Sequence, residues 1–484
     1  MSRTRLIVPS NFIRVDRALP ISLERQVYSS LRQAIRDGLL RPGSRLPATR
    51  LLSLDLGVSR NTIVDAYQRL IAEGYARANA GGGTFVSPQQ FVPATPPKEA
   101  VIPLSPFGHA AKRASAAIPA SGAFSPGLPA LDEFPRAKWS QLMQIRWRST
   151  PLTLTGLDAV LGLGSLREAI AEHIAPMRGI VCSPEQIVIT TGRRSGLVCI
   201  FRALADRGEA VLVEDPCDIA VHDLIQALQL KPIGADVDRE GLKLDALYQI
   251  HPRIAYVTPA RQYPLGTQMS LGRRYELLEW AKKLDVTVVE DEYDGFFNDN
   301  TPQGQSLKAI DVRGRVIYAG SFASSLSPFM NLGFIIAPPG FALLTGQARS
   351  MIGAVPAAPE QAALADFIRG GDFARHVQRM YGVYAERREI LRSELTNQLA
   401  GFVRATTESG MNLIAWLAPE IDDADVSAAA SRRGIDAPAL SHFSINRELQ
   451  PALVLGYGAT APDAIPDAVR TLAMAIEATP AKAS

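Results

Sequence analysis

The chain has 484 residues, which favours two or three domains, and its 47% hydrophobic and 20% charged residues are typical of a soluble globular protein. It contains no apolar run of about 18 residues, and its first residues have no apolar run long enough for a signal peptide, so we expect neither a membrane span nor a signal peptide. The cysteines (Cys182, Cys199 and Cys217) suit neither a disulfide framework nor a common zinc site, so we expect a cytoplasmic protein without bound metal. The net charge of +3 is uneven, because thirteen arginines, no lysine and six carboxylates give residues 1–87 a charge of +7 and leave −4 for the rest.

The basic first segment, residues 1–88, has the pattern of a helix-turn-helix. Apolar residues repeat at helical spacing between residues 23 and 38, and a short helix follows in ATRLLSLDLG and stops at Gly57. Ser59 then stands in the place of an N-cap before the next helix. Two extended runs around the glycines of YARANAGGGTFV predict a β-hairpin wing. A basic charge alone is equally compatible with an ordinary solvated surface. Together with this pattern, the charge indicates a unit that binds a polyanion.

The helix after Ser59 is the candidate recognition helix, because its first turn is rich in groups that suit phosphates and base edges. The plain alternative is that Ser59 only caps the helix and Arg60 only keeps the surface soluble. The stretches DGLLRPGSRLPATR, LGVSRNTIVDAYQRLIAEGY and GGGTFV resemble the GntR-type winged helix. This resemblance implies that the contacts to double-stranded DNA come from Arg50, Ser59, Arg60, Asn61, Thr62 and the wing glycine Gly81.

Beyond the basic segment, residues 89–120 are rich in proline, alanine and serine and are interpreted as a semi-extended linker. Residues 121–484 alternate short apolar runs with helical segments, which predicts an α/β fold with a mostly parallel central sheet and helices on both faces. The clearest expected strands are 186–190, 210–214, 254–258, 286–291, 315–320 and 332–338. Residues from about 373 to 484 begin with a long helix and favour a small C-terminal α+β subdomain.

This second part resembles the fold-type I enzymes that use pyridoxal phosphate. The resemblance rests on motifs in family order, among them FSPGLPALDEFPRAKW, GLGSLREAIAEHI, YVTPARQYPLG and VVEDEYDGFF. With its basic first segment, the whole chain resembles a MocR-type regulator of the GntR family. That resemblance implies an aminotransferase-like fold, a homodimer, and a ligand pocket at the carboxyl ends of the strands.

A pyridoxal phosphate enzyme needs a lysine for the Schiff base, a carboxylate on the ring nitrogen and a cup for the phosphate. By the resemblance, Asp291 matches the carboxylate and Tyr293 matches the tyrosine that hydrogen-bonds the ring hydroxyl. An N-cap or an ordinary ion pair is the alternative role for Asp291. Ser321 and the helix start at Gly192 match parts of the phosphate cup, where backbone N–H groups favour an anion.

Other positions depart from the pattern of these enzymes. Ser324 stands where the Schiff-base lysine is expected, and a serine hydroxyl cannot form an imine. Asn331 replaces an arginine of the phosphate cup. Arg193 replaces a small residue, and there it either grips an anion or fills the cup; Asp218 replaces a common aromatic residue. We therefore do not expect transamination.

Three functions remain open from the sequence. The leading hypothesis is a DNA-binding transcription regulator whose second part dimerises and senses a small ligand without Schiff-base chemistry. The ligand could be pyridoxal phosphate held noncovalently, another small anion, or nothing. The second hypothesis is an active aminotransferase with a DNA-binding segment, and the residue at position 324 speaks against it. The third is an architectural DNA binder whose affinity for DNA is indifferent to metabolites.

Overall fold

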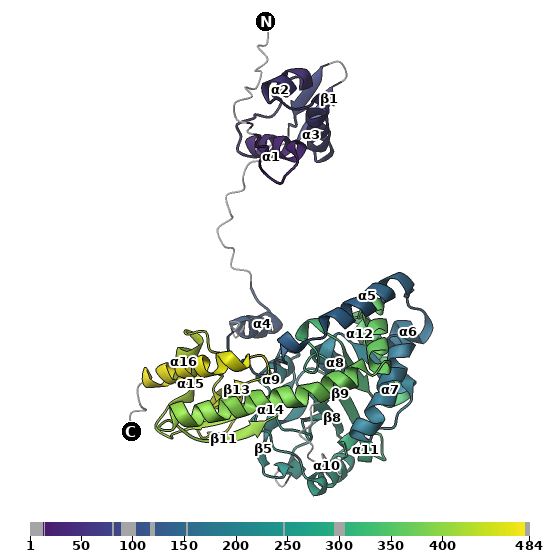
Figure 1. Ribbon diagram of the computed structural model, residues 1–484. Coiled ribbons are helices and arrows are strands. Elements are labelled where there is room, and N and C mark those ends of the chain that lie inside the picture. The colour runs from purple at the N-terminus through teal and green to yellow at the C-terminus, as the bar shows by residue number, and fades with distance from the viewer. Residues whose placement is uncertain are drawn as a thin grey trace. The chain divides into compact units, whose positions relative to one another are not determined.

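The chain folds into two compact units, residues 1–103 and 104–484, which we call the head and the body (Figure 1). The computed structural model describes residues 13, 15–79, 82–88, 103–116, 122–151, 153–244, 247–294 and 305–479. Most of the expected linker, 89–120, lies outside the described residues.

The part of this segment that the structure describes differs from a semi-extended linker, because it contains helix α4 (Pro106–Ala116). Ser105 accepts a hydrogen bond from the backbone of Gly108 at 3.1 Å, and proline at the first helical position loses no hydrogen bond. Within the body, α4 packs against helix α9 (Ile219–Ala227). Tertiary packing supports a short helix whose sequence shows no sustained periodicity.

The head has the expected winged helix-turn-helix order in its described residues. Its elements are helices α1 (Leu23–Arg36), α2 (Thr49–Asp55) and α3 (Arg60–Ala72), then strands β1 (Ala76–Asn79) and β2 (Gly83–Val86). The two strands pair antiparallel.

Helix α3 is held against the rest of the head by a small apolar core. Val27 and Leu31 of α1 and Ile63 and Leu70 of α3 are completely buried, and the two helices pack together. The hydroxyl of Tyr67 donates a hydrogen bond to the carbonyl of Pro47 at 2.9 Å, which satisfies a polar group inside this core. These contacts fix α3 and leave its first turn at the surface.

The body is built on one large sheet with the strand order β3-β10-β9-β8-β7-β4-β5-β6. The strands are β3 (Ile187–Thr190), β4 (Ala210–Asp215), β5 (Lys231–Asp238), β6 (Gly241–Leu242), β7 (Ile254–Val257), β8 (Thr287–Glu292), β9 (Val316–Ser321) and β10 (Gly333–Ile336). The pairs from β9 through β8, β7 and β4 to β5 are parallel, whereas β10 and β6 run antiparallel to their neighbours. The expected mostly parallel sheet is confirmed, and the six expected strands end within two residues of the observed bounds.

Helices cover both faces of this sheet. They are α5 (Arg136–Ser149), α6 (Gly156–Leu161), α7 (Gly164–Arg178), α8 (Gly192–Leu204), α9, α10 (Leu271–Lys283), α11 (Leu307–Ile310), α12 (Pro339–Met351) and α13 (Ala358–Arg369). Alternate residues of β3 belong to different apolar cores, since Ile187 and Ile189 pack in one and Val188 in the other. Both faces of the strand are therefore buried, as the period of two predicts.

The expected C-terminal subdomain is also present, and Figure 1 shows its long helix α14 (Asp372–Leu399) running across the body. Its three-stranded antiparallel sheet comprises β11 (Val403–Ser409), β12 (Asn412–Leu417) and β13 (Ala452–Gly456), and helices α15 (Asp423–Ser431) and α16 (Ile465–Glu477) complete it. None of the described helices combines the length and the apolar character needed to cross a bilayer.

Candidate functional sites in the head and the body

In the head, the first turn of α3 carries four of the six expected DNA contacts. Ser59 is the N-cap, and its Oγ accepts a hydrogen bond from the backbone N–H of Thr62 at 3.1 Å. The hydroxyls of Ser59 and Thr62 also lie 2.8 Å apart. The cap satisfies one of the unpaired N–H groups at the start of the helix, so Ser59 has a structural role whatever else it contacts.

The next three expected contacts, two on this turn and one on α2, all lie at the surface. Arg60, Asn61 and Arg50 are exposed, and the Nε of Arg60 lies 3.5 Å from the hydroxyl of Thr49 at the start of α2. The N-terminal ends of α2 and α3 therefore lie together, and both carry the positive end of a helix dipole. Gly81 lies outside the described residues.

The structure places further arginines near these elements that the motif did not single out. Arg17 donates a hydrogen bond at 2.7 Å to the carbonyl of Gly57, in the turn between α2 and α3. Arg77 is exposed on strand β1 of the wing, and the guanidinium of Arg45 packs against Gly83 on β2. The excess of arginine over residues 1–87 is the sequence signal that could have included them.

In the body, the centre of the candidate pocket is a cluster of charged side chains. Arg193, in the first turn of α8, places its Nη1 at 2.6 Å from Oδ2 of Asp291 on β8 and its Nη2 at 2.7 Å from Oδ2 of Asp218. The hydroxyl of Tyr256 on β7 donates to the same oxygen of Asp291. We call Arg193, Asp218 and Asp291 the ion cluster.

The ion cluster is shielded from water, so the pKa of each charged side chain depends strongly on the charges of the other two. The Asp291 side chain is fully buried, and those of Arg193 and Asp218 are 17% and 16% exposed. Burial opposes the charge on Arg193, but the two carboxylates raise its pKa well above the usual value. Burial also raises the pKa of Asp291, and Arg193 and Tyr256 act against that rise. The guanidinium is thus the main group that favours an ionised Asp291.

The remaining expected pocket residues follow the ends of neighbouring strands. Ser321 ends β9, and its Oγ accepts a hydrogen bond from the backbone of Ala323 at 3.1 Å. Ser324 is buried three residues later, and its Oγ has no hydrogen-bond partner among the described residues. Tyr293 packs edge-on against Tyr263, with ring centroids 5.0 Å apart.

The expected phosphate cup is narrow at the start of α8. Gly192 has a positive φ of 74°, and an added Cβ there would collide with the carboxamide oxygen of Asn331. An added Cβ at Gly333 would lie 3.1 Å from the backbone nitrogen of Arg193. Glycine is therefore required at both positions for the turn, the strand β10 and the side chain of Asn331 to pack together.

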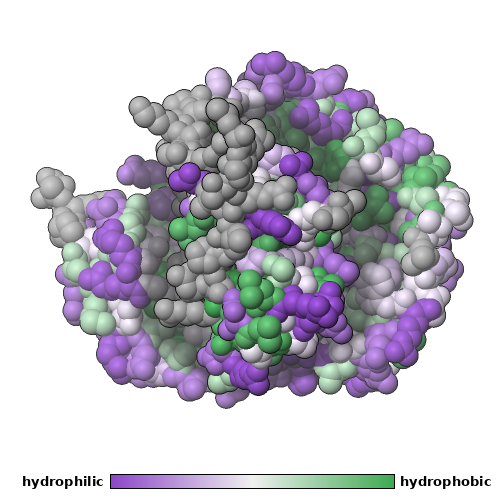
Figure 2. Space-filling model, turned by 90° about the horizontal axis from the view of Figure 1, so that it is seen from above, coloured by the Kyte–Doolittle hydropathy of each residue, from purple (hydrophilic) through white to green (hydrophobic). Residues whose placement is uncertain are grey.

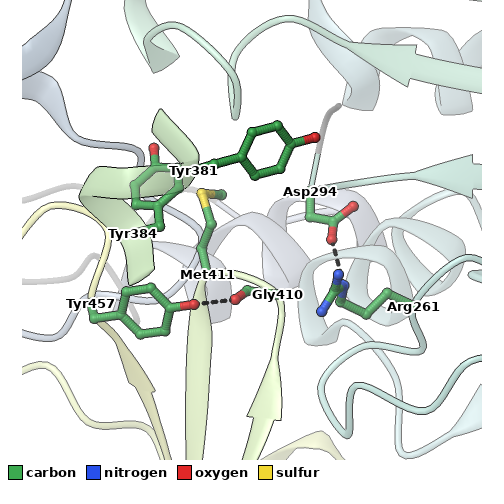
Figure 3. A pocket seen from close by; sticks show the side chains of 7 residues that line it. All are labelled: Arg261, Asp294, Tyr381, Tyr384, Gly410, Met411 and Tyr457. Carbon is green, nitrogen blue, oxygen red and sulfur yellow. Dashed lines mark hydrogen bonds and ion pairs between the residues drawn. The ribbon is translucent and has the colours of Figure 1, made fainter. Parts of the chain in front are cut away.

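A small cavity lies between the large sheet and the C-terminal subdomain (Figure 3). It is lined by Arg261, Asp294, Tyr381, Tyr384, Gly410, Met411 and Tyr457. Arg261 and Asp294 point toward one another and form an ion pair at 2.9 Å. Burial raises the pKa of Asp294 to about 7, against the lowering effect of Arg261. The turn at Gly410, between β11 and β12, rests directly on this ion pair.

Comparison with known proteins shows relatives over both units. Residues 23–86 match the family described as "Bacterial regulatory proteins, gntR family". The chain is 33% identical over 472 residues to the probable rhizopine catabolism regulatory protein MocR of Rhizobium meliloti, covering 95% of this chain and 94% of that protein. It is 30% identical over 441 residues to the pyridoxine biosynthesis transcriptional regulator PdxR of Corynebacterium glutamicum, covering 91% and 92%.

Solved structures of aminotransferases resemble about three quarters of the chain. An α-aminoadipate aminotransferase from Thermus thermophilus superposes with a TM-score of 0.68 at 24% identity, covering 77% of this chain and 97% of that one. An archaeal alanine:glyoxylate aminotransferase gives 0.67 at 25% identity, covering 78% and 96%. The expected aminotransferase-like fold is therefore confirmed. The described residues hold no group of three or more His, Cys, Asp or Glu side chains that could share a metal ion.

Proposed function

Because the chain belongs to the MocR-like transcription regulators of the GntR family, we propose that its body is a dimerising, ligand-sensing module without Schiff-base chemistry. The chain as a whole is a DNA-binding transcription regulator. The observation that carries the proposal is Ser324, which stands after β9 where the Schiff-base lysine is expected. The alternative, an aminotransferase with a DNA-binding head, needs an amine at that place.

The position of the nearest upstream lysine supports the absence of that amine. The nearest upstream lysine, Lys308, is on α11, and its Nζ donates a hydrogen bond at 2.8 Å to the carbonyl of Val316. Val316 is the first residue of β9, whereas Ser321 is the last. Lys308 is therefore held at the opposite end of the strand from the candidate pocket.

For the head, we propose that DNA is contacted by Arg50, Ser59, Arg60, Asn61, Thr62 and Gly81. The support is the exposure of the arginines and of Asn61 at the joined N-terminal ends of α2 and α3. Residues 1–88 would then form the DNA-binding domain, 89–120 the connection, and 121–484 the sensing domain, with its small subdomain from about 373. A cytoplasmic location follows from the function.

We propose that two copies associate through an apolar face on α6, α12 and the segment after α12. Figure 2 shows hydrophobic side chains at the surface on the right of the view, the side where α6 and α12 lie in Figure 1. The exposed residues of this face are Leu157, Leu343, Leu344, Met351, Ile352 and Val355. An unpartnered apolar face of this kind marks an interface, and a second copy is the occupant that brings two heads to two DNA half-sites.

Replacing Met351, which is 87% exposed, with aspartate is expected to shift the dimer toward the 52.2-kDa monomer. A charge within an apolar interface must lose its water when the copies associate. Sedimentation equilibrium measures the mass. The matched control is Val312→Asp, since Val312 is 92% exposed and lies outside this face. A dimer unchanged by Met351→Asp would contradict the interface.

The absence of Schiff-base chemistry is tested with pyridoxal phosphate, borohydride and intact mass. The wild-type protein is expected to give no imine band and no reducible adduct at a single site. Ser324→Lys is expected to give an adduct at residue 324 with weak binding, because Arg193 and Asn331 remain in the pocket. A stoichiometric adduct on the wild-type chain would reopen the aminotransferase alternative, and tight binding by Ser324→Lys would show that the phosphate cup is intact.

A further inference from the structure

The ion cluster occupies the part of the pocket where the fold-type I resemblance places the cofactor ring. Asp291 is the carboxylate that the ring nitrogen would require. Its Oδ2 already accepts from Arg193 and from the hydroxyl of Tyr256, whereas its buried Oδ1 has no hydrogen-bond partner among the described residues. A protonated ring nitrogen would have to bind this carboxylate beside a guanidinium that already pairs with it, so two cations would meet on one buried carboxylate. On this ground the described residues do not fit pyridoxal phosphate. The misfit is also geometric, because the guanidinium of Arg193 already lies against Asp291.

We propose that the guanidinium of Arg193 replaces the ring cation as the partner of Asp291 and excludes pyridoxal phosphate and its amine form from this pocket. This inference rests on the proposed function, in which the pocket carries no Schiff base. It makes Arg193 the residue that determines which ligands the pocket admits. The sensed ligand is then one that binds beside an intact ion cluster, without a pyridinium-like ring on Asp291.

The geometry of Arg193 explains why it does not leave easily. A guanidinium is a planar fork, and here its two terminal nitrogens each reach a different carboxylate, at 2.6 and 2.7 Å. Moving it out would leave Asp291 and Asp218 as two adjacent carboxylates with no cation between them. Burial already raises the pKa of Asp291, so its charge would be poorly tolerated without the guanidinium.

Asp218 gives the cluster a second anchor in the backbone. It is the N-cap of α9, and its Oδ1 accepts a hydrogen bond from the backbone of Ala220 at 2.9 Å while its Oδ2 holds Arg193. The sequence departures at positions 193 and 218 thus belong together, because an added cation and an added carboxylate pair with each other. As the grip for a ligand anion, Arg193 would have only its remaining N–H groups to offer, because Nη1 and Nη2 already hold the two carboxylates that balance its charge.

The test measures noncovalent binding with pyridoxamine 5′-phosphate, which carries the same ring and phosphate but cannot form an imine. Equilibrium dialysis compares the wild-type full chain with Arg193→Ala and with Arg193→Ala/Asp218→Asn. The double variant removes one of the two carboxylates that lose their cation and keeps an acceptor for the cap of α9. Arg194→Ala is the matched control, since Arg194 is the exposed neighbour on the same turn.

We expect no saturable binding to the wild type or to Arg194→Ala. The double variant is expected to bind saturably, with an affinity at least tenfold above the detection limit that the wild type sets. If Arg193→Ala fails to fold, the double variant and the wild type still decide the matter. Saturable micromolar binding by the wild type, or no gain in a folded double variant, would overturn the proposal. Neither result produces the borohydride adduct that would overturn the absence of Schiff-base chemistry, so the two failures are distinguishable.

Discussion

Replacing Arg60 with alanine is expected to weaken binding to a specific DNA duplex by about 10- to 100-fold, the loss of one good bidentate contact to a base. Arg60 is exposed in the first turn of α3, and that turn is fixed by the Ser59 cap and by the core beneath α3. The substitution removes no buried contact, so the head is expected to keep its fold. The loss of affinity therefore measures the contribution of the contact between Arg60 and DNA.

The duplex is first selected by the wild-type protein from a random-sequence pool, and affinities are then measured at several salt concentrations. Arg36→Ala is the matched control, because Arg36 is exposed in the last turn of α1 and carries the same charge. A contact to a base relaxes the preference at one position, whereas a contact to a phosphate lowers the salt slope by about 1. Equal losses for Arg60→Ala and Arg36→Ala would show that only net charge matters.

Replacing Arg178 with methionine is expected to cost the body about 3–5 kcal/mol of unfolding free energy, the usual penalty for leaving one member of a buried ion pair alone. Arg178 binds Glu292 through two hydrogen bonds, at 2.8 and 2.9 Å, and the two side chains are only 4% and 3% exposed. Glu292 would keep the hydroxyl of Tyr318, at 3.2 Å, but lose its cation.

Urea denaturation followed by circular dichroism measures this loss. The double variant Arg178→Met/Glu292→Gln is expected to recover much of it, because the stranded charge is removed with its partner. Arg470→Met serves as the control, since its ion pair with Asp467 is exposed and worth about 1 kcal/mol or less. A change for Arg178→Met as small as that for Arg470→Met would show that the buried pair is not required.

The strands of the body were predictable because each is a short apolar run buried on both faces, as β3 shows with Ile187, Val188 and Ile189. The cap at Ser59 was predictable because it is a local signal between a glycine turn and an apolar helix. The antiparallel β10 between β3 and β9 was not, since the order of strands depends on contacts between distant segments. Helix α4 was missed because its support comes from α9 and not from its own pattern.

In the candidate pocket, too, single residues could be predicted from the sequence but their assembly could not. Sequence comparison marks Arg193 and Asp218 as separate departures from an enzyme pattern, and Asp291 as a retained residue. That all three join in one ion cluster depends on how α8, α9 and β8 are placed, which no local spacing reveals. The ion pair of Arg261 and Asp294 is another example, because its partners come from different strand ends.

The double role of Asp218 also links the ion cluster to the first part of the body. Its carboxylate holds Arg193 with one oxygen and the first turn of α9 with the other. Helix α9 in turn packs against α4, the first helix of the body after the connection to the head. The ion cluster is thus joined by direct contacts to the helix that follows the connection between the two units.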